Sequence, residues 1–161
     1  METSSDTYIA KPPSKGCGIG IFVFKTFDEY QSLKTGEEYV VQRYIENPHL
    51  FHGKKYDMRV HVMLDGVNPQ IAYIHRLGQT RHCAEEFDMT DIRNERKHVS
   101  NYGINLPSPH FVSTKRAQQT GLFASEHYLT DIFDMIKAER PEIDIENDLW
   151  APITRLIINS L

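Results

Sequence analysis

Long hydrophobic runs are missing from this chain of 161 residues, and its first residues do not predict a secretion leader. No apolar stretch approaches the roughly 18 residues that a membrane helix needs. The first residues, METSSD, contain no basic region and no hydrophobic segment. Cysteine is scarce too, because Cys17 and Cys83 are the only two and show no metal-ligand spacing. Free thiols are typical of a reducing compartment, so we expect a cytoplasmic protein without a membrane partner.

A basic surface is also lacking. The net charge is −4, with 15 Lys and Arg against 14 Asp and Glu in residues 1–120, and 3 against 8 in residues 121–161. Nucleic-acid-binding domains usually carry a positive patch, so we predict no nucleic-acid partner. The acidic end is more simply explained by solvated helix faces.

Several catalytic signatures are absent as well. The chain contains no Gly-x-Ser-x-Gly, no Walker lysine motif and no dinucleotide fingerprint. His49 and His52 fall in a predicted loop, and His82 adjoins Cys83 without a distant pair of Cys or His residues. Zinc sites need such spaced pairs, so we predict no metal site within these residues.

What the chain does contain is a series of β-forming segments followed by helical ones. Val, Ile, Tyr and Phe are frequent in five candidate strands, namely 7–11, 19–24, 38–45, 56–64 and 70–77. Turn residues at 65–69 predict a hairpin between the last two strands. A short helix is expected at 27–34, and residues 78–118 are expected to be irregular.

Helical spacing of apolar residues marks the last forty residues. A first pattern stops before Pro141, and a second one continues to the final residue. The members of the two patterns are Leu122, Leu129, Ile132, Phe133 and Ile136, then Leu149, Trp150, Ile153, Leu156 and Ile157. Strands followed by helices predict an α+β protein built on antiparallel hairpins.

The most informative segment is residues 8–20, where a strand ends on Lys11 and glycines follow at 16, 18 and 20. Glycine lets backbone N–H groups approach an anion closely, and a lysine adds a point charge, so this loop is suited to phosphate. It lies between two strands and is therefore not a P-loop. Taken alone, it is equally an ordinary hairpin.

Charged residues alternate along the strand 56–64. Asp57, Arg59 and His61 share one face with Lys55, while aliphatic residues and Met58 share the other. This face is either a solvated surface with cross-strand ion pairs or a ligand site lined by charges. Arg81, just past the hairpin, either binds an acidic group or is simply solvated.

Together these segments resemble the tubulin-tyrosine-ligase-like family of ATP-grasp ligases, and its polyglutamylases most of all. The similarity covers about residues 7–160. The matching segments are YIAKP, KGCGIG, VVQRYIENPHLFHGKKYDMRVHV, YIHRLGQTRHC, HVSNYGIN and DLWAPITRLI. The resemblance implies an incomplete ATP-grasp fold over residues 1–161, of the α+β class with an antiparallel sheet and flanking helices. The family's N-terminal subdomain and its C-terminal metal-binding strands would be missing.

The resemblance also implies roles in nucleotide binding. Lys11 and Lys55 would contact the ATP phosphates, and Asp57 would hold the ribose or order the site. The remaining nucleotide contacts would be Lys15 and Gly16 in the loop, Gln42, Arg43, Tyr44 and Ile45 at the adenine edge, and Ser100 with Asn101.

Two further sets of roles concern the reaction and the added amino acid. Arg59 and Arg81 would meet the incoming amino acid or the acyl-phosphate region. Gly103 and Lys115 would lie near the amino-acid substrate, although the family has a serine at the first position. Glutamate is the expected co-substrate and tubulin or the microtubule the expected partner, in the cytoplasm and cytoskeleton, with cilia and flagella left open.

The family's Mg²⁺ ligands, an aspartate and a Glu-x-Asn triplet, are expected on strands beyond Leu161. Phosphoryl transfer without them would leave the developing charge poorly compensated. We therefore expect a fragment that is inactive alone, with Trp150, Ile153 and Ile157 left exposed. The alternatives are a non-catalytic tubulin-binding or regulatory module derived from the family, and an unrelated ATP-grasp ligase acting on a small molecule.

Overall fold

The computed structural model describes residues 6–161, which divide into two units. Unit 1 comprises the chain up to Asp57 together with Arg81–Ser125. Unit 2 comprises Met58–Thr80 and Glu126–Leu161. Each unit is described below by itself.

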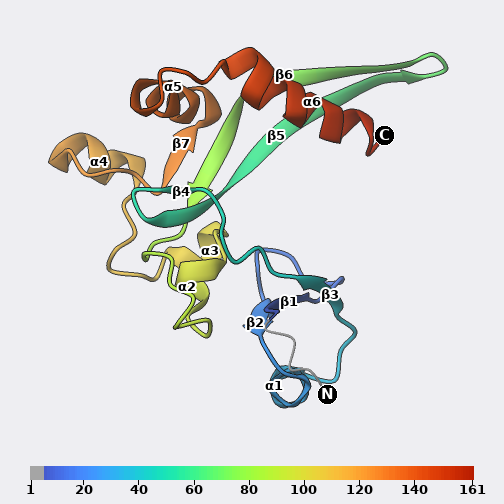
Figure 1. The fold of residues 1–161 in the computed structure, drawn as a ribbon, viewed down its shortest axis with the longest axis vertical. Helices are drawn as coiled ribbons and strands as arrows, with labels where there is room; N and C mark the ends of the chain where they lie inside the picture. Colours follow the sequence, from blue (N-terminus) through green and yellow to red (C-terminus); the bar gives the residue numbers. More distant parts are fainter. Residues whose placement is uncertain (1–5) are drawn as a thin grey trace. The chain divides into compact units, whose positions relative to one another are not determined.

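Unit 1 begins with a three-stranded antiparallel sheet (Figure 1), made of β1 (Tyr8–Lys11), β2 (Phe22–Phe24) and β3 (Val40–Arg43) in the order β2-β1-β3. The hydrophobic strand β1 is therefore central, and β3 lies at an edge, as the sequence indicated. The predicted strand 19–24 is shorter than expected. Gly18 and Gly20 adopt positive φ angles of 83° and 77°, which extended strands do not use.

The predicted helix at 27–34 is present as α1 (Phe27–Leu33). Thr26 caps it, because its Oγ1 accepts a hydrogen bond from the Glu29 backbone N–H at 3.3 Å. Glu29 in turn accepts one from the Lys25 backbone N–H at 2.7 Å. This reciprocal arrangement satisfies donors that a helix start leaves free.

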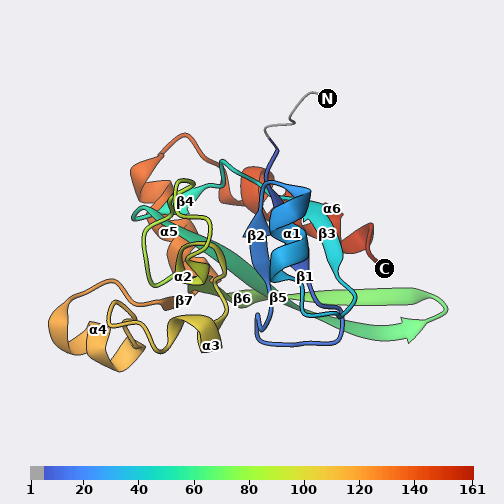
Figure 2. The ribbon, with the colours of Figure 1, turned by 90° about the horizontal axis from the view of Figure 1, so that it is seen from below.

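The second sheet has the order β4-β5-β6-β7, with β4 at Leu50–Phe51, β5 at Lys54–Val67, β6 at Gln70–His82 and β7 at Glu126–Tyr128. The predicted hairpin is confirmed, and both of its strands are longer than expected. Within 78–118, which was expected to be irregular, β6 continues to His82. Three short helices then follow in unit 1 (Figure 2), namely α2 (Glu95–His98), α3 (Tyr102–Asn105) and α4 (Thr114–Thr120).

Unit 2 contains the helices α5 (Leu129–Glu139), η1 (Ile145–Trp150) and α6 (Ala151–Ile158). The helical pattern correctly predicts the core face of α5, where Leu129, Ile132, Phe133 and Ile136 are buried. Leu122 lies outside this helix and is exposed.

The expectation that Trp150, Ile153 and Ile157 would be exposed is wrong. Trp150 is only 5% exposed and packs edge-on against Phe133 with ring centroids 5.4 Å apart. Ile153 and Ile157 are half-buried, whereas Leu156 and Ile158 are exposed. The helical pattern therefore correctly marks the packed side of η1 and α6 at Trp150, Ile153 and Ile157, and it fails only at Leu156.

The fold class is confirmed as α+β with antiparallel strands. Across the described residues 6–161, no helix has the length and apolar character needed to cross a membrane.

Candidate functional site

Lys11 and Gln42 meet across the N-terminal sheet of unit 1. Lys11 ends β1 and Gln42 lies on the neighbouring strand β3, where Ile9 is its register partner. The Lys11 ammonium donates a hydrogen bond to Gln42 Oε1 at 2.9 Å. The antiparallel register therefore holds a cation at the open edge of the sheet, next to an amide.

Lys55 lies on β5 and is held by two groups of unit 1. Its Nζ donates to the backbone carbonyl of His98 at 2.9 Å, and it lies 5.9 Å from the centroid of the Tyr44 ring. Tyr44 is buried and its hydroxyl is 2.9 Å from His98 Nδ1. Tyr44 thus supports Lys55 from inside the unit, and its ring does not lie on the exposed edge of β3.

The ammonium of Lys55 is in a partly desolvated position. Burial lowers the pKa of Lys55, and the nearby positive charge of Lys11 lowers it further, while Asp57 raises it. Burial also raises the pKa of the neighbouring Cys83 thiol to about 12, so this thiol is neutral near pH 7. Two cations that repel each other at one site provide a favourable environment for a ligand of several negative charges.

Asp57 and Arg81 form a two-pronged ion pair. Arg81 Nε donates to Asp57 Oδ1 at 2.9 Å, and the Arg81 NH2 group donates to Asp57 Oδ2. The side chain of Arg81 is 16% exposed and that of Asp57 is 35% exposed. Both carboxylate oxygens of Asp57 are therefore already engaged by the guanidinium, which orders β5 and β6 at this point.

The glycine loop lies against Asn101. Gly18 is buried with φ +83°, and a Cβ at this position would come within 2.9 Å of Asn101 Oδ1. Gly16 is open, with nothing within 4 Å of such a Cβ. Lys15 pairs with Glu37 at 2.7 Å. The closely packed glycine is thus Gly18 and not Gly16, and the neighbouring Ser100 is buried.

The remaining predicted site residues have surroundings of their own. Arg43 pairs with Asp6 at 2.6 Å, and Ile45 is 71% exposed. Gly103 lies on α3 with open space around it, and Lys115 lies exposed on α4. Arg59 is exposed and belongs to unit 2, and its side chain forms no hydrogen bond or ion pair with any residue in the range 6–161.

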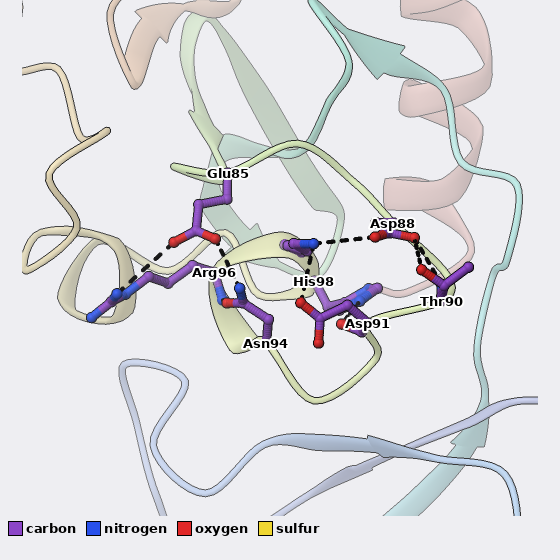
Figure 3. Close-up of polar contacts among 8 residues, drawn as sticks. Glu85, Asp88, Thr90, Asp91, Asn94, Arg96 and His98 are labelled. Atoms are coloured by element: carbon purple, nitrogen blue, oxygen red, sulfur yellow. Dashed lines mark hydrogen bonds and ion pairs between the residues drawn. The ribbon is translucent and has the colours of Figure 1, made fainter.

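A polar loop from Glu85 to His98 fixes the end of α2 (Figure 3). Asn94 Nδ2 donates to Glu85 at 2.8 Å, and Lys97 pairs with Asp88 and Asp91 at 3.2 and 3.1 Å. Hydrogen bonds from Thr90, with the help of Lys97, lower the pKa of Asp88 to about 2. The network orders the loop in which His98 is anchored.

His98 is the site residue that our sequence reasoning missed. It is only 1% exposed and contacts both Tyr44 and Lys55. A signal was present, since His98 begins the HVSNYGIN segment that supported the resemblance. A single sequence does not indicate which polar residue of such a segment is buried.

A cavity of about 780 Å³ is also in unit 1 but involves different residues. Lys54, Phe87 and Arg116 are among those that line it, whereas Lys11 and Lys55 are not. Adjacent strand residues point to opposite faces, so the side chains of Lys54 and Lys55 lie on different faces of β5. The Lys54 ammonium donates a hydrogen bond to the backbone carbonyl of Ala84 at 2.8 Å.

The described residues do not fit a resident metal. Within residues 6–161, no three His, Cys, Asp or Glu side chains are grouped so that they could hold a metal ion. Asp57, the carboxylate nearest to Lys55 in sequence, is bound by Arg81. The site is instead cationic, with two lysines and a glycine loop, and these groups are suited to phosphate oxygens.

These features define an α+β protein with a cationic, glycine-containing candidate site in unit 1. More specifically, the family model for the tubulin-tyrosine ligase family matches residues 1–160, and the chain belongs to that family.

Relatives of this chain include several proteins named as polyglutamylases. A probable beta-tubulin polyglutamylase of Tetrahymena thermophila is 30% identical over 96% of the chain and 13% of its own length. A probable alpha-tubulin polyglutamylase, Ttll1, of the same organism is 29% identical over 96% of the chain and 39% of its own length. Tubulin polyglutamylase TTLL13 of Mus musculus is 34% identical over 96% of the chain and 18% of its own length. The chain thus spans well under half the length of each of these relatives.

Proposed function

We propose that this chain is the nucleotide-binding part of an ATP-dependent, ATP-grasp ligase that adds glutamate to glutamate side chains of tubulin. The observation that carries the proposal is the placement of Lys11 and Lys55. Both belong to unit 1, and the charge of Lys11 is among the causes that lower the pKa of Lys55. Family membership and the names of the polyglutamylase relatives support the choice of reaction and protein substrate.

The proposed roles follow the contacts. Lys11 and Lys55 bind the phosphate oxygens of ATP, and Gly18 brings the loop backbone close to Asn101 beside them. Gln42 and the exposed edge of β3 face the base. The Asp57–Arg81 pair orders the floor of the site. The remaining nucleotide roles assigned by resemblance, for Lys15, Gly16, Arg43, Ile45 and Ser100, stay predictions.

The proposed reaction has two steps. A carboxylate oxygen of a tubulin glutamate attacks the γ-phosphorus of ATP, the bond to the β-phosphate oxygen breaks, and ADP leaves. The amine of free glutamate then attacks the acyl carbon, phosphate leaves, and the new amide loses a proton. Positively charged residues assist by positioning the reactants and offsetting the phosphate charge. Arg59, Arg81, Gly103 and Lys115 are the proposed contacts for the added amino acid or the acyl phosphate.

Mg²⁺ would neutralise phosphate charge in such a reaction. The described residues offer no cluster of ligands for it, so we assign it none of them. We propose that this polypeptide alone binds ATP but does not complete ligation, and that it acts in the cytoplasm on the tubulin cytoskeleton.

The test is calorimetric titration of ATP into the chain and into three lysine variants. Lys11→Ala and Lys55→Met each remove one charge-assisted contact, and we expect each to weaken ATP binding roughly tenfold or more. Lys34→Ala is the matched control, because Lys34 is exposed in unit 1 and its ammonium lies 5.9 Å from the centroid of the Tyr30 ring, away from the proposed lysine pair. Its affinity should equal that of the wild type.

Equal ATP affinity in all three variants would contradict the proposed site. Tubulin co-sedimentation by a chain that binds no ATP would favour the non-catalytic tubulin-binding module instead. Incorporation of labelled glutamate into tubulin by this polypeptide would contradict its proposed inactivity.

A further inference from the structure

The two ring nitrogens of His98 have different partners. Nε2 lies 3.2 Å from the backbone carbonyl of Asp91, and Nδ1 lies 2.9 Å from the Tyr44 hydroxyl. A carbonyl oxygen can only accept a hydrogen bond, so Nε2 carries the proton. In the neutral ring Nδ1 then accepts from the Tyr44 O–H. The contacts therefore select one tautomer of His98 and the direction of its bond to Tyr44.

The same residue also holds the Lys55 ammonium. The backbone oxygen of His98 accepts from Lys55 Nζ at 2.9 Å, and the Tyr44 ring, which His98 orients, lies 5.9 Å from that nitrogen. A lysine side chain has several rotatable bonds, and ordering it costs conformational entropy. A site in which Lys55 is already ordered avoids that cost when a ligand binds.

We infer that His98 is a positioning residue, which holds Lys55 and Tyr44 in a single arrangement for phosphate binding. The inference rests on the proposed nucleotide site and adds to it a residue with no direct ligand contact. It also assigns a role to the Tyr44 hydroxyl that is separate from any contact with adenine.

The charges around His98 favour its neutral form. Burial lowers the pKa of His98, and the positive charge of Lys55 on β5 lowers it further, while the backbone carbonyls of Asp91 and Asp88 and the charge of Asp91 raise it. The other groups against the ring are uncharged, namely Tyr44 after β3 and Phe87, whose ring centroid is 5.3 Å away. A proton on Nδ1 would oppose the Tyr44 O–H and place a second cation beside Lys55.

The experiment compares Tyr44→Phe and His98→Gln with Tyr56→Phe. Tyr56→Phe is a matched control, since Tyr56 also bonds a histidine, with its hydroxyl 3.1 Å from His49 Nδ1. His98→Gln keeps a donor for the Asp91 carbonyl but has no acceptor at the position of Nδ1, which faces Tyr44. We expect ATP affinity to fall roughly threefold to tenfold in the first two variants and to stay unchanged in the control.

A second readout does not require nucleotide. The NMR titration of the Lys55 side chain should shift in Tyr44→Phe and His98→Gln and remain as in the wild type in Tyr56→Phe. If the wild type binds ATP and Lys55 titrates identically in all variants, His98 is not a positioning residue. If the wild type binds no ATP, the proposed function fails and the positioning role fails with it. If Lys55→Met loses ATP binding while Tyr44→Phe and His98→Gln keep it, only the role of His98 is overturned.

Discussion

Two halves of the strand β5 can be compared directly. Lys55 and Asp57 belong to unit 1, are half-buried, and are held by the His98 carbonyl and Arg81. Arg59 and His61 continue the same alternation into unit 2 and are exposed. Both halves present polar residues at every second position. The comparison shows that alternation assigns a face, whereas the packing around that face determines whether its charges are ordered.

The ion pairs of the two units show the same contrast. In unit 1, the side chains of Arg81 and Asp57 are 16% and 35% exposed. In unit 2, those of Arg76 and Glu146 are 58% and 60% exposed. Water screens the second pair much more strongly, even though both pairs are two-pronged.

The largest expected effect is therefore the loss of the unit 1 pair. Arg81→Ala leaves Asp57 half-buried without its partner, and we expect the free energy of unfolding to fall by about 1–3 kcal/mol. Arg76→Ala, the control in unit 2, should cost about 1 kcal/mol or less, including its contact with the Trp150 ring. Urea unfolding measures both, and equal costs would remove the distinction between the two units.

An intermediate effect is expected at the glycine loop of unit 1. Gly18→Ala places a side chain at φ +83° within 2.9 Å of Asn101 Oδ1, and should cost about 1–3 kcal/mol. Gly16→Ala meets open space and should leave the unfolding free energy within about 0.5 kcal/mol of the wild type. Thermal unfolding of both proteins checks this, and a destabilised Gly16→Ala together with an unaffected Gly18→Ala would show that the loop packs differently.

The smallest effect is a pH dependence that belongs to unit 1. His98 has a lowered pKa when folded because it is buried, so the unfolded chain binds its proton first as the pH falls. Its contribution to stability is complete above the ordinary histidine pKa of about 6.5 and is lost as the pH falls from there through the folded pKa. Urea unfolding between pH 5 and pH 8 should show this loss, and His98→Gln should reduce it. An unchanged pH profile in that variant would assign the dependence to other histidines.

Much of the fold was predictable because it depends on local patterns. The hairpin of β5 and β6, the helix α1 and the buried face of α5 each follow from apolar periodicity and turn residues. The boundaries were less predictable. β2 begins late because of the glycine turns, and the second helical pattern divides into the π-helical turn η1 and the helix α6. Both features depend on backbone geometry that composition does not specify.

The candidate site was predictable in part. The resemblance named both Lys11 and Gln42 among the nucleotide-binding residues, and their side chains meet in unit 1. The alternation along the strand placed Lys55 with Asp57 and Arg59 on one face of β5. The sequence did not indicate that Tyr44 is buried against His98, that Arg43 pairs with Asp6, or that Arg81 takes both oxygens of Asp57. Each of these is a contact between residues more than twenty positions apart, and no local pattern encodes such a pairing.

The sequence by itself determined the alternating faces, the family and the residue types that are suited to phosphate, because these depend on spacing along the chain. Only the tertiary structure decided which of those charges are ordered. Burial of His98, Tyr44 and Arg81 removes water from around their partners, and this strengthens hydrogen bonds and charge interactions that solvent would otherwise weaken.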